Sequence, residues 1–337
     1  MKILFIGGTG TISSACTAAA VERGFELYLL NRGTSPRPVP EGAHILKGDI
    51  RDSGSVERAL KGHTFDAVVD WIAFTPEQVE ADLDHFRNRT AQYVFISSAS
   101  AYQKPVRSLP ITESTPLINP HWAYSRAKIA CEERLLRAAR EENFPVTIVR
   151  PSHTYDCTLI PEESGWTTID RMRKGKEIIV HGDGTTTWVL THHRDFAKGF
   201  VGLLGNPRAI GDAFHITSDE ALTWNQIVDT LADAAGTEAR IVHLPSAFIA
   251  AHDPRWGASL LGDKAHSVLF DNTKIKRAVP GYVASIPFYL GAREIIAWHD
   301  ADASRQVVNN ERDALIDKMI AAYKSILPSC PGGGGQG

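Results

Sequence analysis

The feature that most constrains this chain is a glycine-rich turn near its start, between an apolar run and an alanine-rich segment. Residues 3–6 form a short apolar run, as expected for a strand buried on both faces of a parallel sheet. Three glycines follow at once, and residues 11–23 read as a helix. A strand, a glycine turn and a helix in this order place backbone N–H groups at the positive end of a helix dipole, where a pyrophosphate binds. The segment therefore predicts a dinucleotide-binding α/β fold.

The glycines fit two registers of the dinucleotide fingerprint. Gly8-x-Gly10-x-x-Ser13 follows the GxGxxG pattern, and Gly7-x-x-Gly10-x-x-Ser13 follows the wider GxxGxxG pattern. In both registers Ser13 replaces the last glycine and is still small enough for close packing of the helix on the strand. The alternative is a strand-to-helix turn that requires positive φ and binds nothing. The position of the turn directly after a buried strand favours dinucleotide binding.

The composition excludes several classes of partner. The chain has 337 residues, 43% of them hydrophobic and 22% charged, and its formal net charge is −3. Without a basic excess, we expect neither nucleic acid nor an acidic membrane surface as a partner. The N-terminal residues lead directly into the predicted strand, and no apolar run approaches the roughly 20 residues of a membrane span, so we expect no signal peptide and a cytoplasmic protein. Free thiols, and no metal site or disulfide, are predicted from the wide spacing of the cysteines, which are Cys16, Cys131, Cys157 and Cys330.

Strands and helices alternate through the first half of the chain. Strands are expected at 26–30, 43–50, 66–70, 92–97 and 146–150, and helices at 53–61, 75–87 and 121–142. This alternation predicts a right-handed, doubly wound parallel sheet. Periodicity is weaker further on, where we expect helices at 167–175, 192–204, 222–235 and 312–325, and strands at 178–181, 213–217 and 241–245.

Two lobes are expected from this pattern. The predicted Rossmann domain comprises residues 1–157 and 188–217, and a smaller α/β substrate lobe, residues 158–187 and 218–327, covers the C-terminal edge of the sheet. Residues 328–337 are rich in glycine and are predicted to form a flexible tail.

The end of the second strand bears on the choice of cofactor. Asn31 lies roughly 20 residues beyond the glycine turn, where an acidic residue would hold the ribose hydroxyls and repel a 2′-phosphate. Arg32 follows, and its planar fork suits a phosphate or the face of adenine; the alternative is a solvated arginine. The pair predicts NAD(P), with a slight preference for NADP. The other predicted cofactor contacts are Gly7, Thr9, Gly10, Thr11, Ile12, Asp49, Ile50, Ile72, Ala73, Lys128, Pro151 and His153.

Three residues are predicted to carry the chemistry. Tyr124 and Lys128 are four residues apart on a helix and share one face. A phenol is a poor base at neutral pH, but a nearby ammonium lowers its pKa, so that Tyr124 becomes a usable acid/base. Ser98, at the end of a strand, would hydrogen-bond the hydroxyl or carbonyl that exchanges a hydride. The alternative is an ordinary amphipathic helix with a solvated lysine.

Taken together, these motifs resemble the extended short-chain dehydrogenases/reductases, and more narrowly the NAD-dependent epimerase/dehydratase family. The resemblance covers about residues 1–235. It implies that Ser98 is the catalytic hydroxyl and that Lys128 also donates to the nicotinamide ribose. The matching segments are the glycine motif 7–13, Ile72-Ala73 in place of paired alanines, the serine motif 97–102, Tyr124 to Lys128, Arg150-Pro151 and His192 to Asp195.

Departures from the family pattern narrow the expected chemistry. Family dehydratases carry an acidic pair after the catalytic hydroxyl, and family decarboxylases keep a glutamate there, whereas this chain has Ala99-Ser100. This difference argues against dehydration and decarboxylation. Nucleotide-sugar enzymes of the family have an asparagine and an arginine where this chain has Ser152-His153 and 187–189. A smaller sugar or polyol is therefore the expected substrate, and its predicted contacts are Ser100, Ser152, His181, Trp188 and His192.

Two classes of function stay open. The first is an NAD(P)-dependent oxidoreductase or epimerase that uses Tyr124, Lys128 and Ser98. The second is a non-catalytic dinucleotide-binding sensor or an RNA-binding relative of the same fold, against which the intact Tyr/Lys pair and the net charge of −3 argue. The resemblance also implies a homodimer formed through the helix that carries Tyr124 and the helix at 75–87.

Overall fold

A seven-stranded parallel sheet, formed by strands between residues 2 and 216, is the largest sheet in the computed structural model, which describes residues 1–326. Its order is β11-β6-β5-β4-β1-β2-β3, and every pair of neighbours is parallel. The predicted doubly wound fold is therefore confirmed. The strands are β1 (Lys2–Ile6), β2 (Glu26–Asn31), β3 (Ala43–Lys47), β4 (Ala67–Asp70), β5 (Tyr93–Ile96), β6 (Val146–Pro151) and β11 (Ala213–Ile216).

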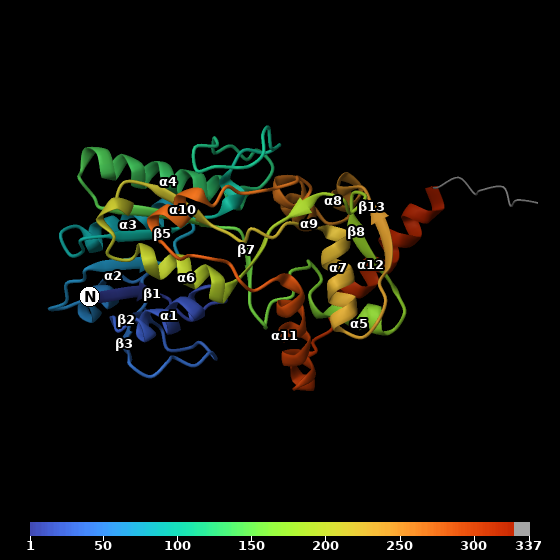
Figure 1. Ribbon diagram of the computed structural model, residues 1–337, viewed down its shortest axis with the longest axis horizontal. Coiled ribbons are helices and arrows are strands. Elements are labelled where there is room, and N and C mark those ends of the chain that lie inside the picture. Colours follow the sequence, from blue (N-terminus) through green and yellow to red (C-terminus); the bar gives the residue numbers. More distant parts are fainter. Residues whose placement is uncertain (327–337) are drawn as a thin grey trace, which may run out of the picture.

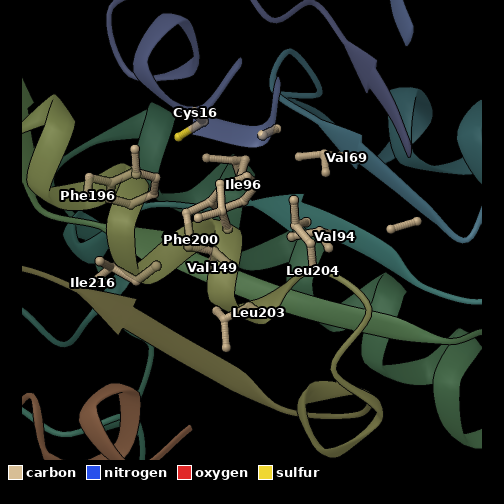
Figure 2. Close-up of a cluster of buried hydrophobic side chains, with 14 of the residues drawn as sticks. Cys16, Val69, Val94, Ile96, Val149, Phe196, Phe200, Leu203, Leu204 and Ile216 are labelled. Carbon is tan, nitrogen blue, oxygen red and sulfur yellow. The ribbon is translucent and has the colours of Figure 1, made fainter. Parts of the chain in front are cut away.

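Helices cover both faces of this sheet because the strand side chains alternate between two apolar clusters. Ile3 and Phe5 belong to the cluster that contains residues of α1 (Ser13–Glu22) and α6 (His193–Leu203). Figure 2 shows Phe196 and Phe200 of α6 among Ile96 and Val149 of the strands. The other cluster contains Leu4 and Ile6 together with residues of α2 (Ser53–Ala59), α3 (Pro76–Phe86) and α4 (Ala123–Glu141).

A second group of helices and strands lies beside the sheet, to the right in Figure 1. The parallel pair β8 (Glu177–His181) and β13 (Arg240–Leu244) forms its small sheet. Around it lie α5 (Trp166–Arg173), α7 (Trp224–Ala234), α8 (Ser246–His252), α9 (Pro254–Ser259), a π-helical turn (Leu260–Lys264), α11 (Phe288–Asp300) and α12 (Asn310–Ile326).

Helix α11 is absent from the helices expected from the sequence pattern. The signal was present, because Phe288, Ala292, Ile295, Ile296 and His299 are buried at helical spacing. The four apolar side chains belong to a core cluster that also contains residues of α5 and α7. The His299 ring stacks on Trp166 of α5.

Two short strand pairs lie between the large sheet and this second group of elements. Figure 1 shows one of their strands, β7, between the two. Strand β7 (His153–Tyr155) pairs in parallel with β10 (Leu190–His192), and β9 (Thr187–Trp188) pairs antiparallel with β12 (Leu222–Thr223). These pairs bring His153 and Trp188 to the edge of the sheet where β6 ends.

The segment that contains α10 (Thr273–Ala278) returns to the large sheet. Ile275 and Tyr282 belong to the same apolar cluster as α6 and β11, whereas all of residues 218–327 are expected from the sequence to lie in the second lobe. The division into two lobes stays a prediction, and the predicted tail at 328–337 lies outside the described residues. Within residues 1–326, no helix is long and apolar enough to cross a membrane.

Candidate active site

A cavity of about 560 Å³ opens at the C-terminal ends of the central strands. This is the edge at which doubly wound sheets bind ligands. Residues following β1, β4, β5 and β6 line one part of the cavity, and residues of the second half line the rest. The lining residues are 7–13, Trp71, Ile72, Phe74, 96–100, Trp122, Tyr124, Lys128, 151–154, Trp188, Val189, Asp263, Lys264 and Val268.

The glycine turn has the geometry of a phosphate cradle. Gly7 and Gly8 have φ values of +98° and +97°, which only glycine adopts without strain. A Cβ on Gly8 would lie 2.8 Å from a methyl carbon of Leu29, so the turn also has no room for a side chain there. Helix α1 begins without a side-chain N-cap. The Ser14 amide already donates to the Gly10 carbonyl at 3.0 Å, but the start of the helix lies at the cavity wall, where the helix dipole favours an anion. These residues fit the pyrophosphate of a dinucleotide.

Polar contacts hold this turn in place. The Thr17 hydroxyl donates to the Gly8 carbonyl at 2.7 Å, and the Gly10 amide donates to the Ser13 hydroxyl at 2.8 Å. Ser13 therefore does more than fill the place of the third glycine. Arg37, which the sequence analysis missed, pairs with the buried Asp156 and reaches the hydroxyl of Thr11 at 3.4 Å.

The serine motif forms a chain of hydroxyls beside the cavity. The oxygens of Ser98 and Ser100 are 2.9 Å apart, and the Ser125 hydroxyl donates to Ser100 at 2.8 Å. The Ser98 side chain also accepts a hydrogen bond from the Ser100 amide at the start of a 3₁₀ turn, Ala99–Ala101. This turn fixes the rotamer of Ser98 at the end of β5, so its hydroxyl is held at the cavity wall.

Tyr124 lines the cavity from the first turn of α4. The pKa of its phenol is raised, chiefly because burial disfavours the phenolate, while a hydrogen bond with Ser98 acts in the opposite direction. The expectation that Lys128 lowers this pKa is therefore wrong for the side-chain arrangement in the structure. Tyr124 is a protonated phenol at neutral pH and can donate a proton.

Lys128 is buried one turn further along α4. Its ammonium donates to the carbonyls of Ala73 at 2.7 Å and Ile96 at 2.8 Å. It lies 6.0 Å from the centre of the Tyr124 ring and 4.5 Å from that of Phe74. Burial lowers the pKa of Lys128 to about 8. The lysine therefore ties the ends of β4 and β5 to the helix of Tyr124.

Most of the predicted site residues line this cavity, but two of the predicted substrate residues do not. His181 is buried and its Nε2 lies 2.9 Å from the carbonyl oxygen of Lys264. His192 caps α6 with Nδ1, and its Nε2 lies 3.1 Å from Glu294. Both imidazoles bond to groups inside the protein, so neither is a candidate substrate contact.

Five of the predicted cofactor residues also lie outside the cavity lining. Arg32 is exposed, and Asn31 accepts a hydrogen bond from the Gly33 amide at 2.9 Å. Asp49 accepts from the Arg51 amide at 3.0 Å, and Ile50 is buried in the sheet core. Ala73 contributes its carbonyl to Lys128. All five follow or end strands of the large sheet at the same edge as the cavity.

Sequence reasoning missed several residues of the cavity wall. Trp71 and Phe74 follow β4, so their position after a buried strand was a usable signal. Trp122 precedes Tyr124, but Asp263, Lys264 and Val268 come from a distant segment without a motif. Only the tertiary structure brings these three to the serine motif.

The chain belongs to the NAD dependent epimerase/dehydratase family, whose model matches residues 3–217. It is similar to a chloroplast stem-loop binding protein of 41 kDa from Arabidopsis thaliana, with 30% identity over 97% of this chain and 85% of that protein. It is also similar to 2'-dehydrokanamycin reductase from Streptomyces kanamyceticus, with 24% identity over 84% of this chain and 80% of that enzyme.

Solved structures share the fold. An epimerase from Methanothermobacter thermautotrophicus matches with a TM-score of 0.74 and 18% identity, over 90% of this chain and 94% of that one. UDP-glucose 4-epimerase from Bifidobacterium longum, solved with NAD⁺ and UDP, matches with a TM-score of 0.72 and 18% identity, over 90% of this chain and all (100%) of that one.

Dehydratases also match this chain. A dTDP-glucose 4,6-dehydratase from an Actinoplanes strain is 24% identical over 90% of this chain and 99% of that enzyme. The comparisons therefore give no support to the exclusion of dehydration, which depends only on Ala99-Ser100 replacing an acidic pair.

Proposed function

We infer that this protein is an NAD(P)-dependent reductase or epimerase that acts at a hydroxyl or keto carbon of a sugar or polyol. The observation that carries this inference is the convergence of Ser98, Tyr124 and Lys128 on one cavity that the glycine turn also lines. The similarity to a reductase and to sugar-nucleotide epimerases supports it.

When bound, the nicotinamide cofactor supplies hydride transfer, and the residues of this chain do the remainder. Ser98 donates a hydrogen bond to the oxygen of the reacting carbon. Tyr124 transfers the proton, since reduction of a carbonyl to a hydroxyl needs one hydride and one proton. Because the pKa of Tyr124 is raised, the phenol carries at neutral pH the proton that a reduction consumes. Lys128 holds the ends of β4 and β5 in place beneath the site.

The proposed cofactor is NADP in preference to NAD. Arg32 is exposed at the end of β2 and its guanidinium can pair with a 2′-phosphate in a bidentate manner. Asn31 presents no negative charge that would repel this phosphate.

Tyr124→Phe tests the proposed function. We expect turnover to fall by roughly 10²- to 10⁴-fold, the usual contribution of a general acid/base, while NADPH affinity is unchanged. The assay follows NADPH absorbance with a panel of keto sugars and reports configuration by NMR. Tyr289→Phe, at a half-exposed tyrosine on α11, is the matched control. Unchanged turnover in Tyr124→Phe would contradict the proposal.

RNA binding is the second candidate, because a relative over nearly the whole chain is a stem-loop binding protein. Its test is a mobility-shift titration with a stem-loop RNA at about 0.15 M salt, where phosphate contacts are screened. The net charge of −3 leads us to expect no shift.

We also propose a homodimer formed through α3 and α4, which sedimentation would detect as a species of twice the mass of one chain.

A further inference from the structure

The π-helical turn Leu260–Lys264 forms part of the cavity wall and carries a charged pair. Asp263 lines the cavity, and its Oδ1 lies 3.0 Å from the ammonium of Lys104. The Lys104 side chain is only 1% exposed, and among residues 1–326 Asp263 is its one ion-pair partner. A buried ammonium is costly unless it is paired, so this lysine holds a carboxylate at the cavity.

One buried amide fixes this turn relative to the serine motif. Asn119 donates from Nδ2 to the carbonyls of Ser100 at 2.9 Å and Gly262 at 2.6 Å. Its Oδ1 accepts from the amide of Trp122 at 3.1 Å. The residue before Asp263 is thereby joined to the turn of Ser98 and to the start of the helix that bears Tyr124.

Close packing and a second set of hydrogen bonds hold the same turn. A Cβ on Gly262 would lie 2.5 Å from that of Trp122, so the Gly262 backbone packs closely against the base of the Trp122 side chain. The Lys264 carbonyl meets Nε2 of His181 at 2.9 Å and accepts from Nε1 of Trp224 at 3.2 Å. Asp263 therefore lies on a rigid support, although the turn has the irregular geometry often found at functional sites.

The position of Asp263 relates it to the reacting centre. Asp263 and Tyr124 both line the cavity, and the negative charge of Asp263 adds a smaller contribution to that of burial in raising the pKa of Tyr124. Lys104 faces one carboxylate oxygen, and a carboxylate offers about four acceptor positions. Acceptor positions remain for a ligand that contacts Tyr124.

The aromatic lining nearby suits a sugar ring. Trp122 and Trp188 both line the cavity, and indoles provide apolar faces against which the C–H groups of a pyranose or cyclitol pack. The neighbouring lysine, Lys264, faces Glu163 at 3.6 Å. A phosphate or carboxylate on the substrate would therefore meet Asp263 without an unpaired cation beside it.

We propose that Asp263, held by Lys104, is a substrate-binding residue that accepts hydrogen bonds from hydroxyl or ammonium groups next to the reacting carbon. The substrate class is then a neutral or cationic polyhydroxylated ring and not a sugar phosphate. This inference rests on the proposed function and deepens it.

Asp263→Asn tests the inference by direct binding to the NADP⁺-loaded protein. The neutral probes are methyl α-D-glucopyranoside, methyl α-D-galactopyranoside and myo-inositol, and the anionic probe is glucose 6-phosphate, all measured by saturation-transfer NMR titration. We expect the best neutral probe to bind Asp263→Asn roughly 10- to 100-fold more weakly than wild type, as for loss of a hydrogen bond to a charged group. The anionic probe should bind the variant more tightly than wild type.

Asp219→Asn is the matched control, because Asp219 also pairs with a lysine, Lys276 at 2.8 Å, but on the surface. A second variant, Asp263→Asn combined with Lys104→Met, removes the buried unpaired ammonium and keeps the test valid if the single variant fails to fold. NADP⁺ affinity and thermal unfolding should match wild type in this double variant, while neutral probes bind as weakly as to the single variant.

Equal binding of the neutral probes to wild type and to a folded Asp263 variant overturns the inference. Binding of none of them to wild type also overturns it, as does tighter binding of glucose 6-phosphate to wild type than to the variant. The proposed function fails separately: unchanged turnover in Tyr124→Phe refutes the proton-transfer role and leaves the Asp263 binding result standing.

Discussion

The indole Nε1 of Trp188 donates a hydrogen bond to Nδ1 of His153 over 3.1 Å. Indole N–H is a donor only, so Nδ1 must accept and the proton of the imidazole lies on Nε2. Burial, with a smaller contribution from the charge of Lys264, lowers the pKa of His153 to about 3. His153 therefore presents a neutral N–H donor at the cavity.

This tautomer can be observed directly. In ¹⁵N-detected NMR, we expect His153 to stay neutral from pH 5 to pH 8 with its proton on Nε2. Trp188→Phe removes the donor to Nδ1, so a mixture of tautomers should appear while the ring remains neutral. Protonation of His153 near neutral pH would contradict this prediction.

Stability between pH 5 and pH 8 should depend on a buried pair of carboxyl groups. Asp70 and Asp82 are 0% and 1% exposed, and the Tyr93 hydroxyl donates to Asp82 at 2.6 Å. Burial first, and then the charge of Asp70, raise the pKa of Asp82 well above its usual value. The folded protein therefore keeps a proton that the unfolded chain releases above about pH 4.

The sign follows from this difference in proton binding. The contribution of Asp82 to stability is fully present below its unfolded pKa and is lost as pH rises toward the folded pKa, by up to about 1.4 kcal/mol per pH unit. Asp82→Asn should therefore gain stability relative to wild type between pH 5 and pH 8, measured by urea unfolding. Asp84→Asn, exposed on the same helix, is the control. A constant difference between wild type and Asp82→Asn would refute the prediction.

A second buried pair should dominate the stability of the central strands. Arg150 Nη2 lies 2.6 Å from Oε2 of Glu132, and the two side chains are 5% and 0% exposed. Glu132→Gln leaves a buried guanidinium without its countercharge, and we expect a loss of about 3–5 kcal/mol in the free energy of unfolding. Glu80→Gln, which breaks a surface pair with Arg134, should cost about 0–1 kcal/mol. Similar losses in the two variants would show that burial does not set the difference.

Cofactor preference should depend on Arg32. Arg32→Ala removes the guanidinium proposed to pair with a 2′-phosphate, so we expect NADPH to bind roughly 10- to 100-fold more weakly. The affinity for NADH should not change, because it lacks this phosphate. Arg23→Ala, at an exposed arginine that ends α1, is the control for net charge. An equal loss for both cofactors would contradict the proposed preference.

Local patterns explain how much of the site could be predicted. Tyr124 and Lys128 share a helix face and Ser98 ends a strand, so helical spacing and sheet topology were enough to bring them to one edge. His181 and His192 were predicted to contact the substrate because histidine is common in such sites, and because His181 ends a predicted strand and His192 begins a predicted helix. Whether an imidazole faces a ligand or a carbonyl depends on neighbours that come from remote segments.

The doubly wound sheet, the glycine turn and the family of the chain can all be predicted from local sequence patterns. The local signals are continuous apolar strands, glycines at fixed offsets and a four-residue Tyr/Lys spacing. The right-handedness of the connections then restricts how the strands can be arranged in the sheet. The tertiary structure alone decided the other wall of the cavity. Asp263 is 165 positions from Ser98 along the chain, and their meeting depends on side-chain packing and on the bonds of Asn119, which no local pattern encodes.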